Sequence, residues 1–140
     1  MTGISERGKT ALAAAAEREA DIVGFLREMI AIPAESLNEG DRCRRVRAEY
    51  ERLGFDEVRF DRLGNVVARI GEGPLTILMD GHIDCVGVGD PDAWNHDPFE
   101  GQLEDGKVWG RGAVDELPAV ACMADGRSLA RARGFPDEVA

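Results

Sequence analysis

Apolar residues recur every three or four positions through the first third of the sequence, a spacing that places them on one face of a helix. The first such stretch predicts a helix from about Lys9 to Ile30. Pro33, which lacks a backbone donor, ends it. The predicted buried face consists of Leu12, Ala15, Ala16, Ile22, Val23, Leu26, Met29 and Ile30.

A second helix is predicted to open at Ser36. Ser36 and Glu39 have the spacing of a capping box, in which the serine oxygen and the glutamate side chain each satisfy a free backbone amide. Gly54 is predicted to end this helix. Its buried stripe is predicted to consist of Cys43, Val46, Tyr50 and Leu53.

Three short strands are predicted after residue 54, because the hydrophobic period changes there. The runs are Glu57–Phe60, Asn65–Ile70 and Leu75–Met79, and glycine-containing turns separate them. The third run is almost continuously apolar, which is typical of a strand buried on both faces of a sheet. Because predicted helices lie before and after these strands in the sequence, the predicted fold is an α/β sandwich.

The rest of the sequence predicts a long loop, a short strand and a third helix. Residues 85–106 are rich in Gly, Pro and Asp, and loops of this length are usually functional or disordered. A strand is predicted at Lys107–Trp109, followed by a glycine-containing turn and a helix from about Asp115 to Arg133. Residues 134–140 are predicted to lead into a further strand.

Composition limits the classes of function. Hydrophobic residues make up 44% of the chain and charged residues 31%, which is ordinary for a globular protein. The 17 Lys and Arg against 27 Asp and Glu give a net charge of −10, so neither nucleic acid nor a membrane is an expected partner. The three cysteines form no C-x-x-C pair, and no export or membrane-spanning segment is evident, so a cytoplasmic location is expected.

His82 and Asp84 follow the predicted strand Leu75–Met79, at the carboxyl edge of the sheet where ligands bind in open α/β folds. Alternate residues of an extended chain project to the same side, so both side chains can face one metal site. Asp84 would then either fix the tautomer of a ligand histidine or bind the metal itself. Taken alone, a His-x-Asp triplet is more often a loop histidine held by a nearby aspartate than a metal site.

The string DGHIDCVGVGDPDAWNHDPFEGQLEDGKVWGRGAVDE, with IPAES and LGFDEVRFDRLGNVVARIG upstream, resembles a family of zinc-dependent peptidases and deacylases. The family includes aminoacylase, acetylornithine deacetylase, succinyl-diaminopimelate desuccinylase and glutamate carboxypeptidase, and the resemblance is strongest to its selenium-metabolism-linked hydrolases. It implies that residues 1–140 are the N-terminal portion of a three-layer α/β/α catalytic domain with an incomplete sheet. The C-terminal half and the lid or dimerisation domain are expected to lie outside the sequence.

The resemblance also assigns a metal site. It implies that His82 binds a zinc ion, that Asp84 is the catalytic carboxylate that clamps the His82 imidazole, and that Asp115 bridges two zinc ions. Backbone amides at a helix start help to keep a carboxylate such as Asp115 ionised, and a plain helix N-cap is a compatible role. One or two zinc ions are expected, although an N/O site also accepts cobalt or manganese.

The activity implied by the resemblance is metal-dependent hydrolysis of an amide bond in a small peptide or an N-acyl amino acid. In the family, the metal lowers the pKa of water to about 7 and a glutamate of an adjacent Glu-Glu pair takes its proton. That pair is expected downstream of this sequence. The 140-residue chain is therefore expected to bind zinc weakly, to be inactive alone, and to form homo-oligomers through uncovered apolar surface. The alternatives are a non-catalytic metal- or partner-binding remnant and a truncated product.

Three features depart from the family pattern. Glu116, Leu117 and Pro118 follow Asp115 where many relatives have x-Lys-Gly, so a basic residue is lost. Cys85 stands beside the His-x-Asp triplet, and its thiol is either a further ligand or an inert buried group. His96 matches no ligand of the family and is interpreted as a loop residue.

Overall fold

The structure is a computed structural model and describes residues 4–132. These residues have a mixed α/β structure, with two small antiparallel hairpins in place of one continuous sheet. Its elements are, in order, α1 (Glu6–Glu17), α2 (Glu19–Ile30), α3 (Gly40–Arg52), β1 (Glu57–Phe60), β2 (Val66–Arg69), the 3-10 turn η1 (Pro91–Ala93), β3 (Gln102–Glu104), β4 (Lys107–Trp109) and α4 (Leu117–Ala132).

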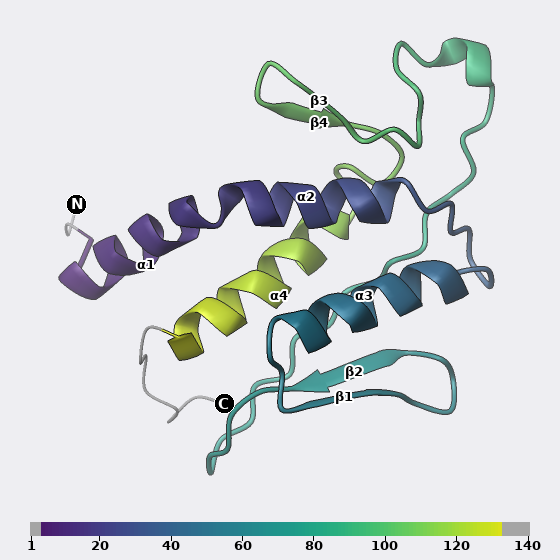
Figure 1. Cartoon of the computed structure of the whole chain (residues 1–140). Helices are drawn as coiled ribbons and strands as arrows, with labels where there is room; N and C mark the ends of the chain where they lie inside the picture. Colours follow the sequence, from purple (N-terminus) through teal and green to yellow (C-terminus); the bar gives the residue numbers. More distant parts are fainter. Residues whose placement is uncertain (1–3, 133–140) are drawn as a thin grey trace.

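The helices form the centre of the molecule. Helix α4 packs against α2. Helix α3 also contacts α2, and it covers the β1–β2 hairpin (Figure 1). The β3–β4 hairpin lies on the side of α2 opposite α3, and α1 lies beyond the N-terminal end of α2 (Figure 1). None of the helices within residues 4–132 is long and apolar enough to cross a membrane.

The predicted first helix is divided in two at Arg18, whose backbone angles (φ −102°, ψ 0°) interrupt the regular helix between α1 and α2. Ser5 caps α1, because its side chain accepts a hydrogen bond from the Gly8 amide at 3.2 Å. Arg18 Nε donates to Asp125 Oδ1 at 2.9 Å, and Asp125 is only 4% exposed. The break thus gives the α1–α2 junction a charged anchor on α4.

The predicted capping box at Ser36 is wrong. Helix α3 begins at Gly40, and the side chain of its N-cap residue, Glu39, accepts instead from the amide of Leu37 at 2.7 Å. Leu37 has a left-handed backbone (φ 72°), so Ser36 lies outside the helix and its hydroxyl is free to bond elsewhere. The predicted end at Gly54 is confirmed, with α3 ending at Arg52.

The first two predicted strands are confirmed as β1 and β2, an antiparallel pair in which Val58 lies opposite Ala68. The third prediction is wrong, because residues 75–79 form no strand and are exposed, Leu78 by 88%. A strand needs neighbours for its backbone donors and acceptors, and no strand within residues 4–132 pairs with this run. Strand β4 is confirmed, whereas its partner β3 within the expected loop was not predicted.

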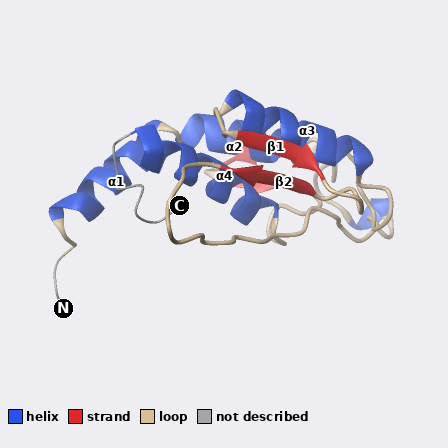
Figure 2. Cartoon of the chain, turned by 90° about the horizontal axis from the view of Figure 1, so that it is seen from below, coloured by secondary structure: helices blue, strands red, loops and turns tan. Residues whose placement is uncertain are grey.

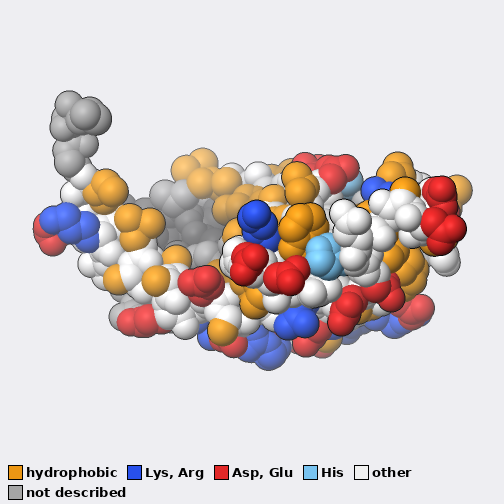
Figure 3. All heavy atoms as spheres, turned by 90° about the horizontal axis from the view of Figure 1, so that it is seen from above, with side chains coloured by type: hydrophobic (Ala, Val, Ile, Leu, Met, Phe, Trp, Pro, Cys, Tyr) orange, Lys and Arg blue, Asp and Glu red, His pale blue; other side chains and the backbone are white. Residues whose placement is uncertain are grey.

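The hydrophobic core lies where α2, α3 and α4 meet. Met29, Ile30, Leu117 and Ala121 are fully buried there. Seen from below, the helices lie behind the β1–β2 hairpin (Figure 2). Apolar side chains also reach the surface among charged ones (Figure 3), so the fold leaves apolar area uncovered.

The third predicted helix begins two residues later than expected, at Leu117, and is described to Ala132. Its expected last residue, Arg133, and the expected strand lead-in at 134–140 lie outside the described residues.

Candidate metal centre

His82 lies in the loop that follows the exposed apolar run, and its side chain is 48% exposed. Asp115, in the turn before α4, lies next to His82. Gly112 in this turn has φ +85°, and a Cβ there would lie 2.6 Å from Cys85 Sγ and 2.7 Å from Leu117 Cδ1. Only glycine combines that backbone with such close packing, so it brings the two loops together.

The two edges of the His82 ring face different carboxylates. Nδ1 lies 3.1 Å from Asp84 Oδ1 and 3.2 Å from the Asp84 carbonyl oxygen. Nε2 lies 3.4 Å from Asp115 Oδ1 and 3.9 Å from Glu116 Oε2. The structure therefore brings together His82, Asp84 and Asp115, the residues that the sequence singled out, and adds Glu116.

Asp84 is held from its far side by Ser36, whose hydroxyl donates to Asp84 Oδ2. This hydrogen bond is the largest cause of a lowered Asp84 pKa; desolvation opposes it and the nearby His82 adds to it. An ionised Asp84 accepts a hydrogen bond from Nδ1 of His82. In a neutral imidazole that arrangement leaves Nε2 unprotonated, with its lone pair directed toward Asp115.

The pKa of His82 is raised. Desolvation lowers it, but the hydrogen bond to the Asp84 carbonyl and the negative charges of Glu116, Asp115 and Asp84 outweigh that effect. An excess of negative charge around one imidazole is an environment that a cation can occupy. A metal ion at this site would compete with a proton for Nε2.

Asp115 does not occupy the helix N-cap position. The carbonyl of Glu116 accepts the first helical hydrogen bond of α4, from the amide of Val120 at 3.0 Å. The Asp115 side chain is 82% exposed and is directed at His82 instead of at the helix backbone. The capping role that the sequence left open for Asp115 is therefore not what the structure shows.

Arg42 supports the metal-site loop from inside the molecule. It is fully buried, and its Nη1 donates to the carbonyl of Ile83 at 2.5 Å while its Nη2 donates to the carbonyl of Ile32. The amide of Cys85 also donates to the carbonyl of Ala34 at 2.8 Å. These bonds fix residues 83–85 to the segment after α2, which also contains Ser36.

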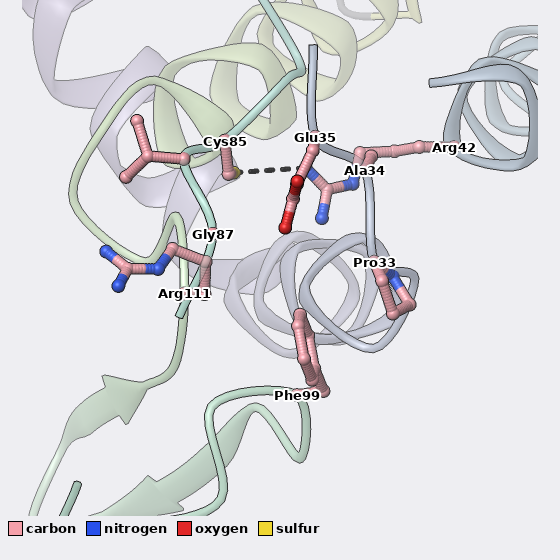
Figure 4. A pocket seen from close by; sticks show the side chains of 9 residues that line it. Pro33, Ala34, Glu35, Arg42, Cys85, Gly87, Phe99 and Arg111 are labelled. Atoms are coloured by element: carbon pink, nitrogen blue, oxygen red, sulfur yellow. Dashed lines mark hydrogen bonds between the residues drawn. The ribbon is translucent and has the colours of Figure 1, made fainter. Parts of the chain in front are cut away.

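Cys85 lines a small pocket between this loop and the segment after α2. Its Sγ lies 3.1 Å from Arg42 Nη1, and Figure 4 shows this bond with the guanidinium between Cys85 and Ala34.

His96 packs its ring on Trp109, with 4.7 Å between the ring centroids, and its Nδ1 lies 2.9 Å from Gln102 Oε1. Both contacts place His96 against the β3–β4 hairpin.

The donors fit a metal ion in kind, because imidazole nitrogen and carboxylate oxygen suit zinc, cobalt and manganese. They do not complete a site. Within residues 4–132 no group of three or more His, Cys, Asp or Glu side chains is arranged to hold a metal ion. A zinc site needs three or four protein ligands. The described residues thus present a partial donor set.

Sequence reasoning missed three residues that shape this site: Ser36, Arg42 and Glu116. Ser36 was assigned to a helix cap, and Arg42 lies within an otherwise charged helix where nothing in the spacing distinguishes it. Glu116 could have been noticed, because it is a carboxylate that directly follows Asp115.

A comparison with known protein families matches the segment that carries these residues. Residues 78–137, which contain His82, Asp84 and Asp115, match the family described as Peptidase family M20/M25/M40. This segment belongs to that peptidase family. The family resemblance inferred from the sequence is confirmed.

Similarity to individual proteins extends beyond this segment. The chain is 41% identical over 130 residues to the Escherichia coli protein described as uncharacterized protein YgeY, covering 93% of this chain and 32% of that protein. It is 38% identical over 107 residues to a succinyl-diaminopimelate desuccinylase of Cereibacter sphaeroides (74% of this chain, 28% of that enzyme). A desuccinylase of Methylobacterium nodulans is 47% identical over 74 residues (53% and 19%). The chain spans about a third or less of the length of these relatives.

Proposed function

We propose that this chain contributes part of the metal centre of a hydrolase that cleaves amide bonds. His82 and Asp115 are the proposed metal ligands, and Asp84 is the proposed residue that orients His82. The observation that carries the proposal is the opposite placement of the carboxylates, with Asp84 at Nδ1 and Asp115 at Nε2 of one imidazole. Membership of a peptidase family and similarity to desuccinylases support amide hydrolysis as the reaction class.

Each residue has a defined task in this proposal. Asp84 accepts the Nδ1 proton and so keeps Nε2 free to donate its lone pair. Ser36 keeps Asp84 ionised and oriented. Asp115 supplies a charged oxygen on the other side of Nε2. A bound zinc ion would supply Lewis-acid polarisation of the substrate carbonyl and lower the pKa of water.

The proposed substrates are small peptides or N-acyl amino acids. Two relatives named as succinyl-diaminopimelate desuccinylases support an acylated amino group as the target. For the 140-residue chain itself we propose weak zinc binding and no hydrolysis, because its described donors leave the coordination sphere incomplete. The domain assignment and a cytoplasmic location remain predictions.

Zinc titration tests the proposed site. The purified chain is titrated against a chromophoric zinc chelator, beside the variants His82→Ala and Asp115→Asn. Both variants are expected to lower zinc affinity by about tenfold or more, because each removes a proposed ligand. His96→Ala is the matched control, since His96 contacts the β3–β4 hairpin, and its affinity should stay within about twofold. Equal affinity of wild type and His82→Ala would contradict the proposed site.

Hydrolysis is measured separately. Release of amino acid from N-succinyl and N-acetyl amino acids is followed with zinc present. No turnover is expected from the 140-residue chain. Turnover that disappears in His82→Ala would contradict the proposed inactivity while supporting the proposed site.

A further inference from the structure

Glu116 forms a contact that the proposed ligands do not explain. Its Oε2 accepts a hydrogen bond from the main-chain amide of His82 at 2.7 Å. The two residues are 34 positions apart in the sequence, and the bond joins the loop that carries His82 to the start of α4. Asp115 directly precedes Glu116. One short segment therefore accepts a hydrogen bond from the His82 backbone through Glu116 and faces the His82 ring with Asp115.

The backbone at Gly81 and at Glu116 allows the Glu116 side chain to lie close to the His82 amide. Gly81 precedes His82, and a Cβ at Gly81 would lie 3.1 Å from the side chains of Val120 and Met123 and 3.4 Å from Glu116 Oε2. Glu116 itself has a left-handed backbone with φ +32°. Such a conformation is uncommon for a residue other than glycine and persists only where neighbouring structure enforces it. The close packing at Gly81 involves the same Oε2, whereas the backbone conformation of Glu116 is a separate observation.

The geometry separates Glu116 from the proposed ligands. Its Oε2, the oxygen that accepts from the His82 amide, lies 3.9 Å from Nε2, farther than the 3.4 Å of Asp115 Oδ1. That oxygen is already engaged with a backbone donor. A carboxylate bound to the main chain beside a ligand acts by fixing the position of that ligand.

We infer that Glu116 is a positioning residue of the metal centre, which holds the backbone of His82 so that Nε2 faces Asp115. This inference rests on the proposed function. Its chemical requirement is an acceptor oxygen at the position of Oε2. The amide oxygen of a glutamine side chain also meets this requirement.

Zinc affinity of three variants tests the inference. Glu116→Ala removes the acceptor and is expected to weaken zinc binding about tenfold, as loss of an outer partner of a ligand commonly does. Glu116→Gln keeps a carbonyl oxygen and is expected to stay within about twofold of wild type. Glu72→Ala, at another exposed glutamate, is the matched control and should bind zinc as wild type does.

Glu116→Gly separates positioning from folding. Glycine accepts the left-handed backbone without strain, so the unfolding midpoint of this variant should fall less than that of Glu116→Ala. Its zinc affinity should nevertheless fall as in Glu116→Ala. A merely structural role predicts that affinity follows stability, and wild-type affinity in Glu116→Gly would overturn the inference. Equal losses in Glu116→Gln and Glu116→Ala would also overturn it, because the charge would then be what matters.

The amide resonance of His82 in the metal-free protein tests the contact independently of zinc. In a ¹⁵N–¹H spectrum, Glu116→Ala should shift this resonance, and Glu116→Gln should leave it near its wild-type position. If the wild-type chain bound no zinc, the proposed function would fail for this chain, while this spectrum would still decide on the contact. A His82 amide that is unmoved in Glu116→Ala overturns the inference.

Discussion

Asp84 Oδ1 lies 3.1 Å from Nδ1 of His82, on the opposite edge of the ring from the nitrogen that faces Asp115. Ser36, from the segment between α2 and α3, donates its hydroxyl to the other oxygen of the same carboxylate. The orientation of one imidazole therefore depends on three separate parts of the chain.

Ser36→Ala should weaken zinc binding by up to about tenfold, because Asp84 loses the partner that orients it. Ser36→Thr retains a hydroxyl and should bind zinc close to the wild-type level. Ser5→Ala is the control, since Ser5 caps α1. The measurement is competition with a chromophoric chelator, and identical affinities of Ser36→Ala and wild type would show that Asp84 is oriented without Ser36.

Arg42→Met should destabilise the fold. Methionine can fill the buried space, but the carbonyls of Ile32 and Ile83 lose a charged donor, at about 1–3 kcal/mol for each group left unpaired. Arg44→Met is the control, because Arg44 is exposed and pairs with Asp41 one helical turn away, so its change should stay within about 1 kcal/mol. Urea unfolding measures both variants. Equal midpoints for the two would contradict the role given to Arg42.

Glu49 should make stability depend on acid pH. Burial raises its pKa, but hydrogen bonds from Arg52 and Arg45 outweigh this, so the pKa lies below the ordinary value of 4.5. A carboxyl whose folded pKa is lowered contributes its full stabilisation above 4.5 and loses it as the pH falls through the folded pKa. Glu49→Gln should therefore cost about 1–3 kcal/mol at neutral pH and progressively less in acid.

The control for this titration is Glu51→Gln. Glu51 is half exposed and pairs with Arg47 on the surface of α3. Its replacement should change the unfolding free energy by less than about 1 kcal/mol at every pH. A constant difference between wild type and Glu49→Gln from neutral to acid pH would show that the charge of Glu49 contributes nothing.

Leu78→Lys should reduce self-association. Leu78 is 88% exposed in the apolar run 75–79, which pairs with no strand of the described chain. A charge there discourages edge-to-edge contact between copies and removes no buried group, so stability should be unchanged. Leu63→Lys is the control, because Leu63 is 89% exposed in the β1–β2 turn. Light scattering at equal concentration should show smaller species for Leu78→Lys alone.

The sequence by itself determined those features that depend on local spacing. The period of apolar residues gave the helices to within a few positions, and alternation with glycine turns gave β1, β2 and β4. The His-x-Asp triplet and Asp115 could be singled out because their chemistry is carried by residue type and short spacing.

Tertiary structure decided what depends on partners distant in the sequence. Leu75–Met79 has the composition of a buried strand, but a strand forms only where another chain segment supplies its hydrogen bonds. Ser36 has the spacing of a helix cap, but a left-handed Leu37 and an acceptor 48 residues away give its hydroxyl another partner. The bond from the His82 amide to Glu116 likewise spans 34 residues, a separation at which no local pattern specifies a contact.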